Sequence, residues 1–251
     1  MKKMMRKILK ITAIVCLFLL ATAYFTGSAL LVRQHEPQIV CTHIRIDIAD
    51  SSVNRLVLPQ DIYVVLEKNR IMPPGMKLAD INLHQLEQLL LKENGIKECH
   101  VYTRIDGELS MEISLRTPLM RLETTEGGYY LDDSGALFPV TPYRTAYVPV
   151  VSGNIPIKQE EWLAQLYDFG CYIRGHRFWN AQIEQLYVHE PHNIEIIQRI
   201  GHQTVMMGDL SLFEYKLQKL YTFYRTVAAA QGWDRYSLID IRFGDQIVCR
   251  P

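Results

Sequence analysis

The feature that most constrains this chain is an uninterrupted apolar run near its start. Residues 11–32, ITAIVCLFLLATAYFTGSALLV, contain no charged side chain. As a helix rising about 1.5 Å per residue, the run is about 33 Å long and can cross a hydrocarbon core of about 30 Å. Five basic residues and no acidic residue lie in positions 1–10. Because basic flanks stay on the cytoplasmic side, the pattern predicts one transmembrane helix, a cytoplasmic tail at 1–10 and an extracytoplasmic body.

A cleaved signal peptide is the competing interpretation of this run. A short basic region, an apolar stretch and Ala21-Thr22-Ala23, which fits a cleavage site, are compatible with it. The apolar stretch continues beyond that point through Phe25 and residues 30–32, and its full length suits an anchor better. We therefore prefer the anchor, followed by a polar linker at 33–38.

The charge and cysteine content of the remainder argues against several classes of protein. The chain carries 27 basic and 27 acidic residues, but residues 1–33 hold six basic residues and no acid, so the remainder has 27 − 6 = 21 basic against 27 acidic residues. A body of net charge −6 is a poor candidate for nucleic-acid binding, which needs clustered Lys and Arg. Five Cys without a CxxC pair fit neither a zinc site nor a disulfide framework, and whether Cys41 and Cys99 pair is left open.

The first part of the body shows a strand followed by two helices. Residues 40–48 alternate between polar and apolar side chains, which predicts a strand. Pro59 suits the first position of a helix, which Asn69 ends. A second helix begins at Asn82, with Gln85 at the spacing of a capping box.

Two further strands follow this second helix. Residues 99–105 and 108–115 flank Asp106-Gly107, and this pair predicts a two-residue hairpin turn because both positions adopt positive φ. The order strand–helix–helix–strand–strand makes residues 39–120 an α+β domain.

The pattern changes after Pro118 and predicts a β-rich domain with flanking helices at 121–251. A capping box at Ser211 and Glu214 opens a long helix that ends near Gln231. The other predicted elements are a hairpin around 132–135, strands near 148–151, 183–189, 193–199 and 203–207, a helix at 160–173, and a final hairpin of residues 237–243 and 246–250 around Gly244-Asp245.

Catalytic and metal-binding patterns are weak throughout. His189-Glu190-Pro191-His192 lacks the i, i+4 spacing with which two His on one helical face bind zinc, and Pro191 indicates a polar turn instead. Cys171 and His176 could form a nucleophile pair, but no carboxylate is placed to orient the His. We therefore predict no enzyme activity, no metal and no cofactor.

Several segments of the body resemble a known family when taken in order. GIKECHVYTRIDGELSMEISLRTPLMRL (residues 95–122) resembles a POTRA domain. YYLDDSGALFPV (129–140), VPVVSG (148–153) and LIDIRFGDQIVCR (238–250) resemble the β domain of the FtsQ/DivIB cell-division family. The basic tail with one apolar helix matches the same family.

The resemblance implies a single-pass divisome protein of the bacterial inner membrane, located at the septum. Such a protein recruits FtsB- and FtsL-like partners, and FtsW- or FtsI-like proteins as further candidates, and helps to control septal peptidoglycan synthesis without catalysing it. It implies neither a nucleic-acid partner nor a small-molecule substrate. The alternatives are another POTRA-bearing protein of envelope assembly or docking, and a secreted enzyme that uses Cys171 and His176.

The resemblance also implies a binding site at the last strand, where a partner would add a strand to the sheet. An uncovered sheet edge has free N–H and C=O groups. Proline in place of Val248 is expected to remove one of these donors while leaving the fold intact. The predicted site residues are Arg242, Phe243, Asp245, Gln246, Ile247 and Val248.

Overall fold

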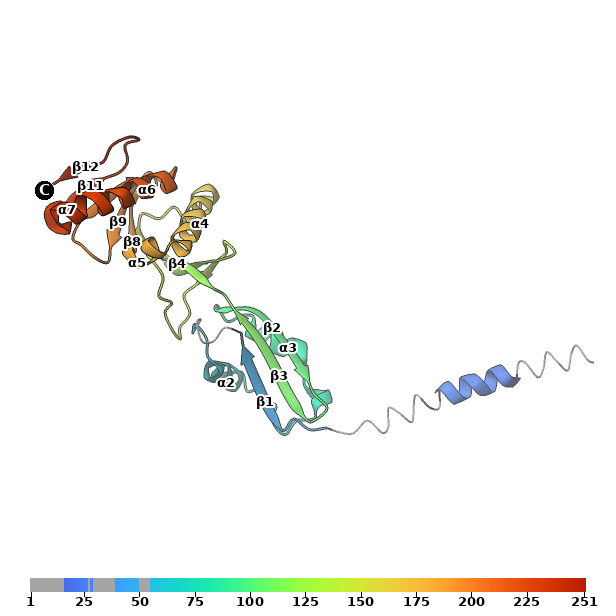
Figure 1. The fold of residues 1–251 in the computed structure, drawn as a ribbon. Helices are drawn as coiled ribbons and strands as arrows, with labels where there is room; N and C mark the ends of the chain where they lie inside the picture. The colour runs from blue at the N-terminus through green and yellow to red at the C-terminus, as the bar shows by residue number, and fades with distance from the viewer. Residues whose placement is uncertain (1–15, 27, 29–38, 50–54) are drawn as a thin grey trace, which may run out of the picture.

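The computed structural model describes residues 16–26, 28, 39–49 and 55–251, and the long C-terminal part forms two lobes (Figure 1). Residues 16–26 are helical. In these described ranges, no helix is long and apolar enough to cross a membrane. The predicted tail at 1–10, the linker at 33–38 and both ends of the predicted span at 11–32 lie outside the described residues.

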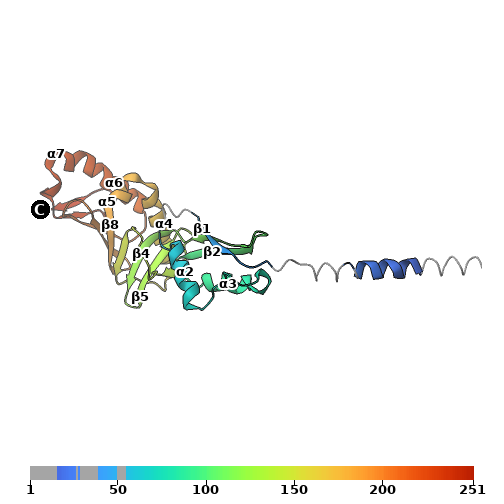
Figure 2. The same cartoon turned by 90° about the horizontal axis from the view of Figure 1, so that it is seen from below.

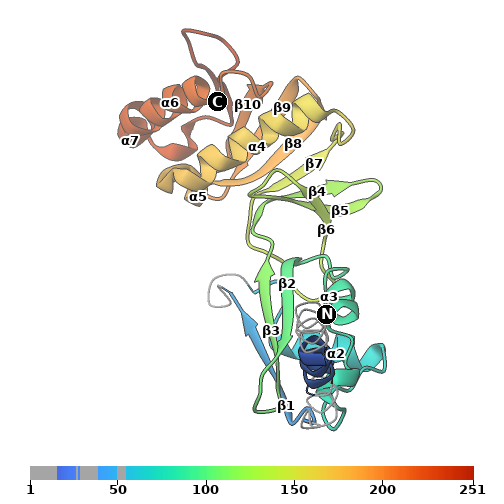
Figure 3. The ribbon, with the colours of Figure 1, turned by 90° about the vertical axis from the view of Figure 1, so that its right-hand side faces the viewer.

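The first lobe is a three-stranded sheet with two helices on one face (Figures 2 and 3). Strand β3 is central, with β1 parallel and β2 antiparallel to it. The predicted β-α-α-β-β order is confirmed. The elements are β1 (His43–Ile48), α2 (Pro59–Lys68), the 3₁₀ turn η1 (Leu78–Asp80), α3 (Leu83–Leu90), β2 (Ile96–Thr103) and β3 (Glu108–Leu115).

Local sequence signals explain the helix boundaries of this lobe. Pro59 occupies the first position of α2, and Asn69 caps its C-terminus. The Asn82 side chain accepts a hydrogen bond of 3.0 Å from Gln85 N, which satisfies one of the free N–H groups at the start of α3.

The turn between β2 and β3 differs from the predicted two-residue turn. It comprises residues 104–107, and Gly107 alone among them has positive φ, at +89°. Asp106 instead accepts a hydrogen bond of 3.1 Å from Glu108 N through Oδ1. A Cβ on Gly107 would lie 2.8 Å from the Val40 carbonyl oxygen, so the glycine also allows the segment just before β1 to pass beside the turn.

The second lobe is a nine-stranded mixed sheet in the order β12-β11-β10-β9-β8-β7-β4-β5-β6. Residues 118–124, for which the sequence pattern predicts no strand, form β4, which continues the chain from β3 into this sheet (Figure 1). The first strands and helices are β4 (Pro118–Thr124), β5 (Gly127–Asp132), β6 (Leu137–Pro139), β7 (Val150–Gly153), α4 (Glu160–Gly175), α5 (Arg177–Gln182), β8 (Ile183–Glu190), β9 (Asn193–Gln198) and β10 (Thr204–Gly208).

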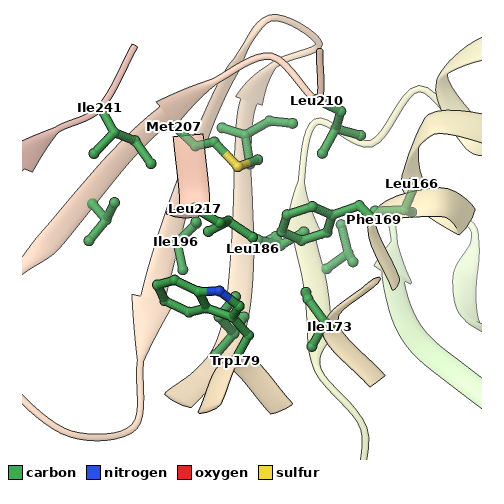
Figure 4. Close-up of a cluster of buried hydrophobic side chains, with 14 of the residues drawn as sticks. Leu166, Phe169, Ile173, Trp179, Leu186, Ile196, Met207, Leu210, Leu217 and Ile241 are labelled. Atoms are coloured by element: carbon green, nitrogen blue, oxygen red, sulfur yellow. The ribbon is translucent and has the colours of Figure 1, made fainter. Parts of the chain in front are cut away.

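Helices α4 to α7 cover one face of this sheet (Figure 3). Their apolar side chains meet those of the central strands in one continuous core, where Phe169, Trp179 and Leu217 are almost fully buried (Figure 4). Burial of this kind contributes about 25 cal/mol per Å² of apolar surface and holds the helices to the sheet.

The predicted long helix at 211–231 is interrupted. It comprises α6 (Phe213–Phe223), a π-helical turn η2 (Tyr224–Ala228) and α7 (Ala229–Gln231), after which come η3 (Trp233–Arg235), β11 (Leu238–Asp240) and β12 (Val248–Arg250). The predicted capping box is wrong, because the Ser211 hydroxyl donates 2.6 Å to Asp209 Oδ1 and Leu212 at φ +49° precedes the helix.

The two lobes pack against each other through buried side chains. Tyr130 and Phe138 of the second lobe are buried in the core of the first lobe. An ion pair joins Arg144 to Asp61, which is only 8% exposed. Tyr143 donates a hydrogen bond of 3.0 Å to Glu93. These contacts fix the segment between β6 and β7 against the first lobe.

Candidate partner-binding site

Strand β12 forms one edge of the nine-stranded sheet, at the end of the molecule far from the first lobe (Figures 1 and 3). It pairs antiparallel with β11, so that Arg250 lies opposite Leu238, Cys249 opposite Ile239, and Val248 opposite Asp240. Its other side carries no strand among those that the structure describes.

The hydrogen-bond register shows which backbone groups of β12 face outward. Ser237 O accepts from Thr204 N and Ile241 N donates to Met206 O, so Ile239, which lies between them in β11, directs its ladder groups to β10. Because the backbone N–H and C=O groups of successive residues in a strand point to opposite sides, those of Leu238 and Asp240 point to β12. The backbone N–H and C=O groups of Arg250 and Val248, which lie opposite these two residues, point to β11. The Arg250 carbonyl also accepts a hydrogen bond of 2.9 Å from Ser237 N.

Cys249, opposite Ile239, therefore points its N–H and C=O away from the sheet. This corrects the expectation for Val248. Its N–H faces β11, so a proline at that position would break the hairpin itself rather than the free edge. Cys249, which the sequence analysis did not select, carries the outward donor and acceptor of this short strand.

The hairpin that ends the chain is shorter than predicted. Each strand has three residues, and residues 241–247 form an irregular loop between them instead of a two-residue turn at Gly244-Asp245. Lys219 of α6 holds this loop, since its Nζ lies 3.0 Å from Gly244 O and 3.2 Å from Gln246 O and also contacts Phe243 O. An ammonium group with several carbonyl acceptors replaces the regular ladder that the loop lacks.

The predicted site residues lie along this loop and the start of β12. Phe243 is 44% exposed, whereas Ile241 is fully buried, so Phe243 does not face the core. Asp245 and Gln246 are exposed, and Ile247 and Val248 are half-buried.

Arg242 is already engaged within the chain. Its guanidinium forms a bidentate pair with the buried Asp240 carboxylate, with Nη2–Oδ2 at 2.6 Å and Nε–Oδ1 at 2.9 Å. Burial raises the pKa of Asp240, but the hydrogen bonds from Arg242 outweigh it and hold that pKa below its ordinary value. Arg242 thus keeps the loop in place and still exposes about half of its side chain, 46%, to a partner.

A groove of about 410 Å³ lies beside the loop, between the loop and α6. Asp245 and Ile247 line one side and the helix lines the other. The sequence pattern predicts the helix, but it does not show which face of the helix lies beside the loop at 241–247. The groove residues on the helix were therefore not predicted. The helix contributes Tyr215, Gln218, Lys219, Thr222, Phe223 and Thr226.

The other residues considered for chemistry occupy structural positions. His189 is hydrogen-bonded to Glu195 at 3.0 Å. The His176 imidazole accepts from Trp179 N at the start of α5, and no hydrogen bond joins it to Cys171 in the described part of the chain. Within the same residues, no group of three His, Cys, Asp or Glu side chains could hold a metal ion.

Cys41 and Cys99 are unpaired thiols in the first lobe. Both are buried, and burial raises the pKa of each, to about 11 for Cys99. Their thiolate forms are therefore disfavoured near neutral pH.

Comparison with known families decides where the chain belongs. A profile described as FtsQ/DivIB, C-terminal related, matches residues 117–250, which is more than half of the chain, and a POTRA-like domain profile matches residues 39–114. The chain belongs to the FtsQ/DivIB family. No curated protein matches it. The resemblance inferred from the sequence is confirmed, and membership makes the chain a cell-division protein of a non-enzymatic family.

Proposed function

We propose that the chain is a bitopic scaffold of the division machinery, anchored in the bacterial inner membrane by residues 11–32 and located at the septum. It would recruit FtsB- and FtsL-like proteins, with FtsW- and FtsI-like proteins as further partners, and so help to regulate septal peptidoglycan synthesis. The domain limits 39–120 and 121–251 stay a prediction.

The observation that carries this proposal is the uncovered edge at β12. Cys249 directs its N–H and C=O outward there, as strand addition by a partner requires. Phe243 and Ile247 offer apolar contact beside the edge, and the groove along α6 can take partner side chains. A short edge strand with half-buried neighbours is less prone to self-association than a long flat one.

The proposal is tested by complementation. A fluorescent fusion of the full chain should gather at the division site and restore division in cells depleted of the native protein. Cys249→Pro, at normal protein level, should fail to restore division, whereas Cys249→Ala should restore it. Even distribution of the wild-type fusion around the envelope, with normal septa after depletion, would favour a general envelope-assembly role instead.

A further inference from the structure

A second groove, of about 690 Å³, lies at the junction of the two lobes. It is distinct from the C-terminal edge and shares no lining residue with the groove along α6. Pro118 and Leu119 of β4 and Ile173 of α4 line it, together with the segment from Arg144 to Pro149 that crosses to the first lobe. The volume falls within the range of ligand sites, about 300–1,000 Å³.

The groove is positively charged although the body around it is acidic. Arg55, Arg144 and Arg174 line it, and none of its lining residues is acidic. Arg144 is committed to Asp61. Arg174 makes only a long contact of 3.8 Å with Asp133, and its side chain is 47% exposed.

Arg55 forms no ion pair with any residue that the structure describes. Arg55 and Arg174 therefore offer two guanidinium groups with capacity for an incoming anion.

An exposed aromatic ring adjoins these charges. Tyr147, which also lines the groove, is 83% exposed. The Arg199 guanidinium lies over its ring at 4.4 Å from the centroid, a distance at which the cation and the ring attract each other. An exposed ring with a fixed orientation is a suitable apolar contact for a partner, because little entropy is lost when it is covered.

The backbone beside Tyr147 has unused hydrogen-bonding groups. Residues 144–149 belong to no helix or strand. The N–H groups of Thr145, Tyr147 and Val148 donate to no residue in the described part of the chain. Unpaired backbone N–H groups next to a groove can donate to the carbonyl groups of a bound peptide.

We propose that this groove binds an acidic, unstructured segment of a partner protein. Carboxylates of the segment would pair with Arg55 and Arg174, an apolar side chain would cover Tyr147, and its backbone would pair with residues 145–148. The charge of the groove selects an acidic partner and also speeds encounter at low ionic strength.

The test uses the full chain in neutral detergent and a short fluorescein-labelled peptide of glutamate, glycine and leucine. We expect saturable binding by fluorescence anisotropy that weakens as salt is added. A peptide with lysine in place of each glutamate should not bind. The double variant Arg55→Gln/Arg174→Gln should bind the acidic peptide at least about tenfold more weakly, the equivalent of one lost charged contact.

Matched variants separate this site from a loss of folding. Arg45→Gln removes an exposed, ion-paired arginine elsewhere and should leave binding unchanged. Tyr147→Ala should weaken binding and Tyr147→Phe should keep it. Cys249→Pro should also keep it, which distinguishes this groove from the C-terminal edge.

Three results would overturn the proposal. The first is equal binding of the lysine peptide, and the second is unchanged binding by a folded double variant. The third is arginine-dependent binding of phosphatidylglycerol vesicles by a protein that ignores the acidic peptide, since this would identify the groove as a membrane contact.

Discussion

Replacing Cys249 by proline tests the proposed edge at the single residue whose backbone points outward. Proline has no N–H, so the variant cannot donate to an added strand at that position. The groups that pair β12 with β11 belong to Val248 and Arg250 and remain intact. Cys249→Ala is the matched control, because it removes the half-buried thiol but keeps the donor.

The expected loss follows from the hydrogen bond that disappears. A backbone hydrogen bond contributes about 0.5–1.5 kcal/mol net, and the partner carbonyl left without a donor costs about 1–3 kcal/mol. These two contributions sum to about 1.5–4.5 kcal/mol, which corresponds to roughly 10- to 1,500-fold weaker binding. Both variants lose the thiol contacts, and the free energy of unfolding should fall by about 1 kcal/mol in each.

The assay is biolayer interferometry of the full chain against an immobilised FtsB-like partner, with thermal unfolding to confirm that each variant is folded. Cys249→Ala should bind within about threefold of the wild type, a difference below 1 kcal/mol. Equal affinity of folded Cys249→Pro and Cys249→Ala would refute strand addition at this edge.

Three further predictions concern the contacts that hold the structure. Lys219→Met should loosen the loop at 241–247, weaken partner binding about tenfold through lost preorganisation and lower stability by only about 1 kcal/mol, measured by interferometry and thermal unfolding. Arg144→Met should destabilise the chain by about 1–2 kcal/mol in urea, after discounting for partial solvent exposure, because it leaves Asp61 buried without its partner; the double variant with Asp61→Asn should recover part of this loss. Burial raises the pKa of Asp132, but hydrogen bonds, including one from Arg116, outweigh it and lower the pKa from 3.8. The carboxylate therefore contributes stability above pH 3.8, and this stability is lost as the pH falls through the lower pKa of the folded state. Asp132→Asn should flatten the acid limb of a curve of unfolding free energy against pH.

The first lobe was predictable because its signals are local. Pro59, Asn69 and Asn82 mark the helix ends through the chemistry of their own side chains, and strict alternation identifies β3. The hairpin turn at Asp106-Gly107 was predicted, but its four-residue form was not, because the Val40 carbonyl, far away in the sequence, approaches Gly107.

The second lobe was harder to predict because distant contacts determine its elements. β4 lies between β5 and β7 in the sheet, and its pattern of buried residues reflects these neighbours more than a simple alternation. The helix that begins at Phe213 starts late because Asp209 takes the Ser211 hydroxyl.

The candidate site also depends on contacts between residues that lie far apart in the sequence. The sequence pattern indicates that the chain contains a C-terminal hairpin and that Phe243 is a candidate contact. It does not indicate that Cys249 faces outward, because this depends on the register of β11 against both β10 and β12. Nor does it connect Lys219 to the loop at 241–247, since a long lysine side chain on a helix is ordinarily solvated.

Residue-resolved amide hydrogen exchange tests strand addition at β12 most directly. In the free protein the Cys249 amide should exchange fast, while the amides of Val248 and Arg250, which face β11, should be protected. With an FtsB-like partner at about 100 times its Kd, exchange at Cys249 should slow by up to about 100-fold. Unchanged exchange at Cys249 in a saturated complex, with new protection elsewhere on the chain, would contradict the account.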